Sequence, residues 1–215
     1  MASLVTVSVV DALAEELRER VLDGIYPAGA AVPETDVAAE FGVSRPTAKS
    51  AITSLVGAGL LRREAHRPAF VPRLTAEDAR DLFRVRIPLE LEVVRALIAA
   101  GDIPNGAEAA VEEMRRLPDD VPTSEFVSTD LRFHRALVDR VASPRLSRLY
   151  GSIAGELHLT MIQTRRALGR DRVAVEHGQV LRLMRAGDLA GATGAMLRHL
   201  EGAGDALAQR LETHE

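Results

Sequence analysis

The stretch Asp36-Val-Ala-Ala-Glu-Phe-Gly-Val-Ser-Arg-Pro-Thr-Ala-Lys49 decides the fold of the N-terminal part of the chain. Gly42 provides a tight turn between two short helical segments, and Ser44 is a favourable N-cap residue for the second of them. That second segment begins with polar and basic residues. Two short helices joined by a glycine turn are typical of a helix-turn-helix, whose second helix reads a groove of DNA.

The segments on either side of this stretch extend the pattern. Apolar residues at helical spacing predict a helix before it, and Pro33 suits the first turn of the next helix. The expected elements are helices over about 8–23, 33–41 and 44–58, followed by strands over 60–63 and 69–72 around a polar tip. This order predicts a winged helix-turn-helix DNA-binding domain over residues 1–73.

The second half of the chain has a different pattern, which is nearly all helical. Thr75 and Asp78 are spaced as a capping box, and Pro88 is expected to kink the first long helix. The expected helices cover about 76–100, 104–116, 123–142, 144–168, 172–186 and 188–212. The fold class is therefore mainly α, with an all-α helical bundle over residues 74–215.

The composition excludes several classes of protein. The 215 residues include no cysteine, which rules out disulfides, thiolate metal sites and cysteine nucleophiles. The N-terminus lacks the basic lead of a signal peptide, and no apolar run is long enough to span a membrane. We therefore expect a cytoplasmic protein without a membrane partner. The net charge of −4 argues only weakly against DNA binding, because the position of the basic residues matters more than their sum.

Basic residues gather in the expected DNA-binding domain. Arg45 and Lys49 are four residues apart and share one helix face, while Ser44 and Thr47 add hydroxyl groups near the helix N-terminus, which favours phosphate. Further cations surround the expected hairpin at Arg62, Arg63 and Arg67. Such residues are also common as solvated surface charges. Their combination with the glycine turn favours contact with double-stranded DNA.

Histidines in the second half form a candidate metal site. Asp130 and His134 are four residues apart, so a carboxylate and an imidazole share a helix face. His177 and His199 lie on later helices, and spacing alone does not bring them to that pair. His158 is a competing candidate, and a hydrogen-bonded core histidine is the alternative for each of these residues. Three imidazoles and a carboxylate would suit a divalent ion such as zinc or nickel.

The DNA-binding segment resembles the GntR family of regulators. The resemblance is carried by Gly42-Val-Ser-Arg-Pro-Thr-Ala-Lys-Ser-Ala51, Gly59-Leu60 and Ala69-Phe-Val71. It implies that the start of the recognition helix and the wing contact the operator. The residues concerned are Ser44, Arg45, Thr47, Lys49 and Arg67. This chain departs from the family at Lys49, usually an arginine, at Pro68, often a glycine, and at Thr35, where some members have a basic residue.

The second half resembles the FCD effector domain of the FadR-type GntR subfamily. Asp130-x-x-x-His134, Glu176-His177 and His199-Leu200 carry this resemblance. It implies that Asp130, His134, His177 and His199 bind a metal within the helical bundle. Arg86, in Arg86-Ile-Pro-Leu-Glu90, matches a family arginine that often faces the effector. The alternative for Arg86 is a salt bridge with Glu90, and Pro88 is a departure that would rotate Arg86 away.

Together the two halves predict a transcription regulator that is not an enzyme. We expect a homodimer that binds an inverted-repeat operator and represses until a small carboxylate effector binds at the metal site. A regulator that responds to the metal alone is an alternative. A metal-dependent hydrolase with Glu176 as base and a structural adaptor are further alternatives, and the adaptor would not bind specific DNA.

Overall fold

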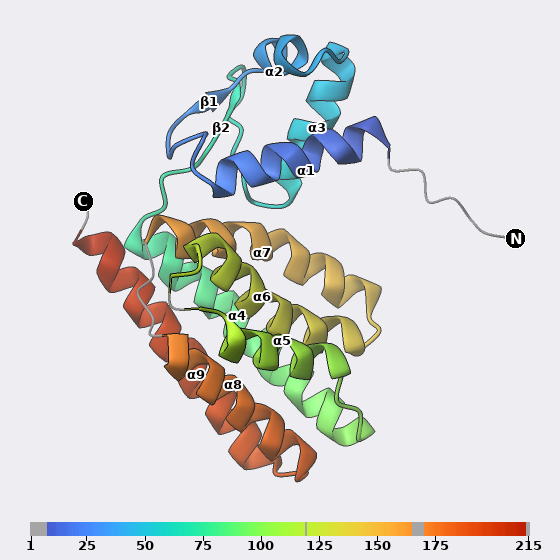
Figure 1. Cartoon of the computed structure of the whole chain (residues 1–215), viewed down its shortest axis with the longest axis vertical. Coiled ribbons are helices and arrows are strands. Elements are labelled where there is room, and N and C mark those ends of the chain that lie inside the picture. The colour runs from blue at the N-terminus through green and yellow to red at the C-terminus, as the bar shows by residue number, and fades with distance from the viewer. Residues whose placement is uncertain (1–7, 119, 165–169, 214–215) are drawn as a thin grey trace, which may run out of the picture. The chain divides into compact units, whose positions relative to one another are not determined.

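The computed structural model describes residues 8–118, 120–164 and 170–213 (Figure 1), and the side chains of Arg170 and Asp171 lie outside this description. The chain divides into two compact units, Met1–Arg73 and Leu74–Glu215. Each has its own core.

The first unit is built on three helices, α1 (Val9–Leu22), α2 (Glu34–Phe41) and α3 (Arg45–Gly57). Helix α3 packs against both α1 and α2 (Figure 1). The side chains of Leu17 and Ile52 are fully buried in this core. Burial of these apolar side chains stabilises the unit and leaves the polar start of α3 exposed.

The turn between α2 and α3 has the conformation that the sequence predicts. Gly42 ends α2 in the left-handed region at φ 63°, which a glycine adopts without steric cost. The Ser44 side chain caps α3 by accepting a hydrogen bond from the Thr47 backbone N–H. Pro46 lies in the first turn of α3, where its missing N–H costs no hydrogen bond. The predicted start of this helix, with Ser44 as its N-cap, is therefore confirmed.

The wing differs from the predicted hairpin. Strand β2 (Ala69–Phe70) pairs antiparallel with β1 (Ala31–Val32), which the sequence analysis did not identify. The predicted strand over 60–63 is wrong, because only Arg62 pairs with Phe70, through two backbone hydrogen bonds of 2.8 and 2.9 Å. The backbone N–H groups of residues 60 and 61 instead bond to the Leu55 carbonyl at the end of α3.

The second unit contains six helices among the residues that the structure describes. They are α4 (Ala76–Ala100), α5 (Asn105–Arg116), α6 (Thr123–Arg140), α7 (Pro144–Gln163), α8 (Arg170–Arg185) and α9 (Leu189–Glu212). The predicted mainly helical fold is therefore confirmed, with ends that agree within a few residues. The predicted continuation of α7 over 165–168 lies outside the described residues.

Helix α4 is the central element of the second unit. It begins with the predicted capping box, in which Thr75 and Asp78 cap each other's backbone N–H. It contacts α6, α7, α8 and α9, and its contact with α9 is the most extensive. At this crossing a Cβ on Gly204 would lie 2.9 Å from Cγ of Phe83, so the helices meet more closely than a side chain at residue 204 would allow.

Pro88 lies inside α4, and the helix continues through it to Ala100. Arg86 and Glu90 on either side of Pro88 both remain on the buried face. The departure at Pro88 therefore does not rotate Arg86 out of the core.

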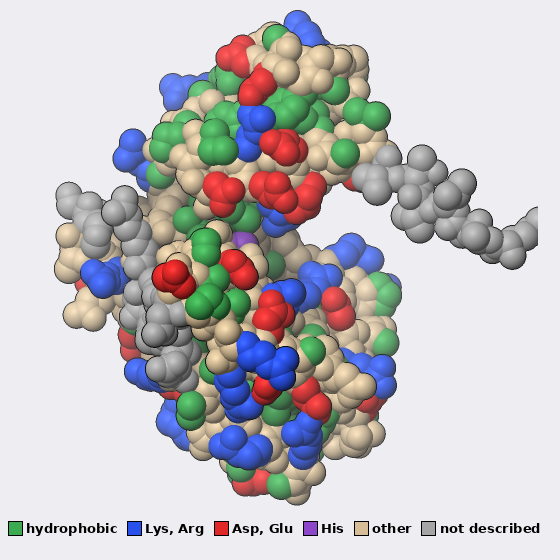
Figure 2. Space-filling model, in the orientation of Figure 1, with side chains coloured by type: hydrophobic (Ala, Val, Ile, Leu, Met, Phe, Trp, Pro, Cys, Tyr) green, Lys and Arg blue, Asp and Glu red, His purple; other side chains and the backbone are tan. Residues whose placement is uncertain are grey.

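The surface of the second unit is strongly charged and mixed in sign. Figure 2 shows Lys and Arg side chains interspersed with Asp and Glu over the face in view. Ion pairs such as Arg116–Glu112 at 2.7 Å and Arg132–Glu113 at 2.6 Å are exposed and contribute little to stability. Within the described residues, no helix is both long enough and apolar enough to cross a membrane.

A candidate metal centre and a candidate nucleic-acid interface

Four side chains that the sequence singled out meet in the core of the second unit. Asp130 and His134 extend from α6, His177 from α8 and His199 from α9, and each is buried. Each residue offers one ligand atom, and these atoms all lie within 4.8 Å of one another. We call these four residues the His/Asp cluster. The topology thus unites two histidines that sequence spacing alone did not bring to the Asp130–His134 pair.

Several buried polar atoms of the cluster have no hydrogen-bond partner. Asp130 Oδ1 and His134 Nε2 are buried without a hydrogen-bond partner. His177 Nε2 lies 3.1 Å from His199 Nε2 and 3.5 Å from Asp130 Oδ1. Two imidazole nitrogens bound to one zinc ion would lie about 3.0–3.4 Å apart. The donor set therefore fits a divalent cation, which would satisfy atoms that are otherwise costly to bury.

Two carboxylates outside the cluster bind the Nδ1 atoms of His134 and His199 and so orient these two rings. His134 Nδ1 lies 2.5 Å from Glu90 Oε2, and His199 Nδ1 lies 2.8 Å from Glu176 Oε2. With the Nδ1–H donating to a carboxylate, Nε2 of each ring keeps its lone pair for a cation. Sequence reasoning missed both roles, since it treated Glu90 only as a partner for Arg86 and Glu176 only as a possible base.

The electrostatics favour neutral imidazoles at His134 and His177 and ionised carboxylates at Glu90 and Glu176. Burial lowers the pKa of His134 and, together with the neighbouring His199 and His134, holds the pKa of His177 well below its usual value. Burial opposes ionisation of Glu90, but Arg86 and His134 outweigh it and hold its pKa below the usual range. The hydrogen bond from His199 lowers the pKa of Glu176. Neutral imidazole is the form that binds a metal.

Arg86, the predicted effector residue, lies beside the cluster on α4. Its Nε donates to Glu90 Oε1 at 2.5 Å, and Tyr150 Oη donates to the same oxygen at 3.1 Å. The salt bridge that the sequence offered as an alternative is therefore present, but it is buried, with both side chains 2% exposed. Arg86 Nη2 is buried without a partner, which leaves its two N–H bonds able to donate to another acceptor.

The other histidines lie outside the cluster. His158 is buried on α7 but does not belong to the only metal-ligand grouping found among the described residues. His66 is exposed at the tip of the wing with φ 62°. His214 lies outside the described residues.

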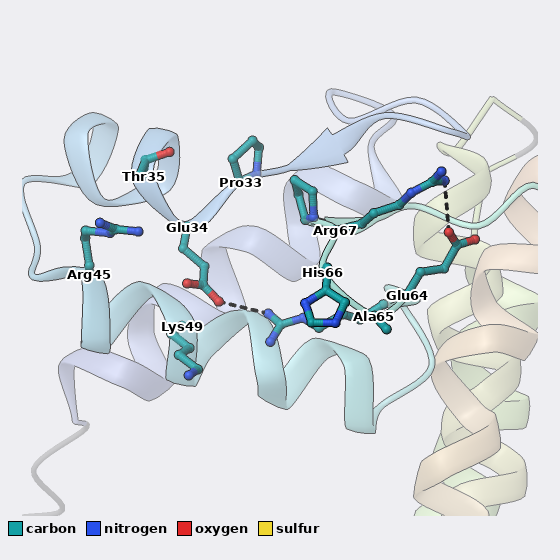
Figure 3. Close-up of a pocket in the computed structure, with 11 residues that line it drawn as sticks. Pro33, Glu34, Thr35, Arg45, Lys49, Glu64, Ala65, His66 and Arg67 are labelled. Atoms are coloured by element: carbon teal, nitrogen blue, oxygen red, sulfur yellow. Dashed lines mark hydrogen bonds and ion pairs between the residues drawn. The ribbon is translucent and has the colours of Figure 1, made fainter.

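Three of the five predicted DNA-contacting residues, Arg45, Lys49 and Arg67, line a groove in the first unit, between α3, the start of α2 and the wing (Figure 3). This groove has a volume of about 470 Å³. It is lined by Pro33, Glu34, Thr35, Arg45, Lys49 and residues 63–68. We call it the basic groove. Ser44 and Thr47 lie at the start of α3, where their hydroxyl groups are 2.8 Å apart, and they do not line the groove.

The cations of the groove differ in their surroundings: two are exposed on α3, and two form ion pairs with glutamates. Arg45 and Lys49 extend from α3 on one side and are exposed. Figure 3 shows Arg67 turned away from them toward Glu64, with which it pairs at 3.0 Å. Arg63 instead pairs with Glu34 at 3.1 Å inside the groove. The sequence counted Arg63 among the basic residues but gave no signal of this pair, because its partners are 29 residues apart.

Each of the two units matches a known protein family. Residues 10–71 match the model for bacterial regulatory proteins of the gntR family, and residues 81–202 match the FCD domain. The chain is 25% identical over 183 residues to the "Probable D-xylose utilization operon transcriptional repressor" of Paenarthrobacter nicotinovorans, a match that covers 84% of this chain and 80% of that protein. It is 26% identical over 148 residues to the gluconate operon transcriptional repressor of Bacillus subtilis, covering 66% and 58% of the two chains.

Solved structures support the same assignment. A GntR transcriptional regulator from Rhodococcus sp. RHA1 superposes with a TM-score of 0.79 at 25% identity, covering 94% of this chain and 98% of that chain. The gntR helix-turn-helix implies DNA binding, and the FCD domain implies effector binding. The prediction of a regulator rather than an enzyme is confirmed by this membership. Since the FCD match covers more than half of its length, the chain belongs to the GntR family of transcription regulators and carries a C-terminal FCD domain.

Proposed function

We propose that this regulator is a repressor that binds an inverted-repeat operator as a homodimer and releases it when a small carboxylate binds beside a divalent metal ion. The observation that carries the proposal is the buried His/Asp cluster with Arg86 beside it. Both relatives compared above are named as repressors of sugar or sugar-acid operons.

The DNA-binding part of the proposal rests on the first unit. Arg45 and Lys49 are exposed on one face of α3, close to the helix N-terminus that favours phosphate. An arginine in the major groove pairs with guanine through two hydrogen bonds, and a lysine adds a point charge. A twofold dimer would present two such helices to the half-sites of an inverted repeat.

The metal part rests on the donor atoms of the His/Asp cluster. Three nitrogens and one carboxylate oxygen suit zinc or nickel, and Glu90 and Glu176 would orient His134 and His199 toward the ion. A bound divalent ion would supply positive charge and open coordination positions for oxygen ligands. His177 stacks on Phe133 at a ring separation of 3.9 Å, which holds the imidazole in place.

The charge of Arg86 beside this site supports the proposed effector class, a small carboxylate. Arg86 offers the unpartnered Nη2, and a guanidinium binds a carboxylate strongly. Gluconate, in the name of the Bacillus subtilis relative, is such a carboxylate. A ligand of this class shifts the operator affinity only by as much as it prefers one arrangement of the second unit over another.

The test measures operator binding by fluorescence anisotropy with DNA from upstream of the protein's own gene. Zinc-loaded protein is titrated with and without gluconate and a panel of other small carboxylates. We expect at least one acid to weaken binding about tenfold, a coupling of ordinary size. Arg86→Lys keeps the charge but loses the planar fork, so it should lose the response. Arg84→Lys, an exposed residue of the same helix, is the matched control.

The outcomes separate the possible regulators. If no carboxylate changes operator affinity in the wild-type protein, the effector part of the proposal fails. If removing the metal alone changes operator affinity, and acids have no further effect, the protein is a metal-responsive regulator. If the protein binds the upstream DNA no more tightly than unrelated DNA, the operator part fails.

A further inference from the structure

Glu90 uses both of its oxygens within the buried interior of the second unit. Oε2 bonds to His134 Nδ1 of the His/Asp cluster, while Oε1 accepts from Arg86 Nε and from Tyr150 Oη. All four side chains are buried. One carboxylate thus joins a metal-ligand histidine to the arginine that carries the unpartnered Nη2.

Glu176, the second carboxylate next to the cluster, also joins a cluster histidine to an arginine, but it does so nearer the surface. Glu176 bonds to His199 Nδ1 at 2.8 Å and to Arg172 Nε at 2.6 Å. The side chain of Arg172 is 63% exposed, whereas that of Arg86 is 2% exposed. Water screens a charge on Arg172, but little screens a charge on Arg86, because the effective dielectric is low in the interior. His134 should therefore sense its arginine much more strongly than His199 does.

We propose that Glu90 is a positioning residue that couples two events, the binding of an anion to Arg86 and the binding of a metal ion at the His/Asp cluster. In the structure, Arg86 and His134 share the charge of one carboxylate. When an anion neutralises Arg86, Glu90 polarises His134 more strongly and makes it a better ligand. The metal and the anion then favour each other's binding, and by linkage the effect is equal in both directions. This inference rests on the proposed metal binding of the cluster.

The test is a double-mutant cycle on zinc affinity, measured by competition with a chromophoric chelator. The proteins are the wild type, Arg86→Met, Glu90→Gln and the double variant. Loss of an orienting carboxylate typically weakens metal binding about 10- to 100-fold, and we expect this for Glu90→Gln. Arg86→Met removes the competitor for Glu90 and should tighten zinc binding.

The effects of Arg86→Met and Glu90→Gln on the free energy of zinc binding should not be additive. Removal of Arg86 acts on the metal both directly and through Glu90, and only the second part disappears with Glu90→Gln. We expect the cycle to depart from additivity by at least about threefold, as contacting residues usually do. The visible spectrum of the cobalt-loaded protein is a second measurement, and Arg86→Met should shift it because the ligand strength of His134 changes.

The matched control is the equivalent cycle at the exposed pair, with Arg172→Met and Glu176→Gln. Arg172→Met should change zinc affinity less than about twofold, because exposed ion pairs are weak. The inference is overturned if Glu90→Gln binds zinc like the wild type, or if the Arg86–Glu90 cycle is additive. If Glu90→Gln does not fold, comparison of Arg86→Met with the double variant still measures the contribution of Glu90, and equal affinities overturn the inference.

Failure of this inference differs from failure of the proposed function. If the wild-type protein binds neither zinc nor nickel, the metal site fails and the coupling fails with it. If the wild type binds zinc and the cycle is additive, only the role of Glu90 fails.

Discussion

The basic groove and the His/Asp cluster use charge in opposite ways. In the groove, Arg45 and Lys49 are exposed, and Arg67 pairs with Glu64 with side chains 73% and 56% exposed. In the cluster, all four residues are buried, and the nearby Arg86–Glu90 pair is almost inaccessible to water. Exposed charges bind a large anion at little cost when it is absent, whereas buried donors are costly until a cation satisfies them.

This difference predicts that the largest single effect lies in the cluster. His134→Ala removes a ligand and the partner of Glu90, so zinc affinity should fall by more than the roughly 100-fold upper value seen for loss of an orienting residue. Equilibrium dialysis with zinc measures it. His158→Ala, also buried but outside the cluster, should bind zinc like the wild type. Equal loss in both variants would show that the effect comes from the fold and not from the ligand set.

The next effect concerns the recognition helix. Arg45→Ala should cost about 1–3 kcal/mol of operator binding and reduce discrimination against altered operators. Arg67→Ala should cost less, because Arg67 points away from Arg45 and Lys49 and its charge is paired with Glu64. Anisotropy titrations on the natural and altered operators measure both. If Arg67→Ala lost more affinity than Arg45→Ala, the wing and not α3 would be the main reader.

The smallest effect tests Glu34, an acid that lines the groove and pairs there with Arg63. Glu34→Gln removes a negative charge that faces DNA phosphates and releases Arg63. Non-specific DNA affinity should rise about threefold at low salt, with the gain disappearing as salt screens the charges. Glu64→Gln, at the other ion pair, is the matched comparison. Weaker binding by Glu34→Gln would mean that the pair with Arg63 holds the wing in its binding position.

The sequence predicted the helices well because each buries an apolar stripe at the helical period. The wing was predicted less well. Strand β1 has only two residues, too few for an alternating pattern to show, and the hydrogen bonds of 60 and 61 go to the end of α3. Cap residues such as Ser44 and Thr75 were identified correctly, because their effect is local to a few residues.

The grouping of the four cluster residues could not be predicted from the spacing of residues along the sequence. Asp130 and His134 share a face through their spacing, but His177 and His199 join them only through the packing of α8 against both α6 and α9. Resemblance to a family supplied that grouping, whereas residue spacing did not. The roles of Glu90, Tyr150 and Glu176 depend on contacts between helices, for which a sequence pattern of one helix holds no signal.

The close crossing at Gly204 limits how this domain can acquire new effectors. Phe83 precedes Arg86 by three residues on α4, and Gly204 follows His199 by five residues on α9. We expect any side chain at 204 to meet Phe83 near its backbone and to displace both helices, together with Arg86 and the candidate metal ligand His199. Engineering or natural variation of effector specificity is therefore expected to proceed through side chains around a conserved helix spacing, with residue 204 remaining glycine.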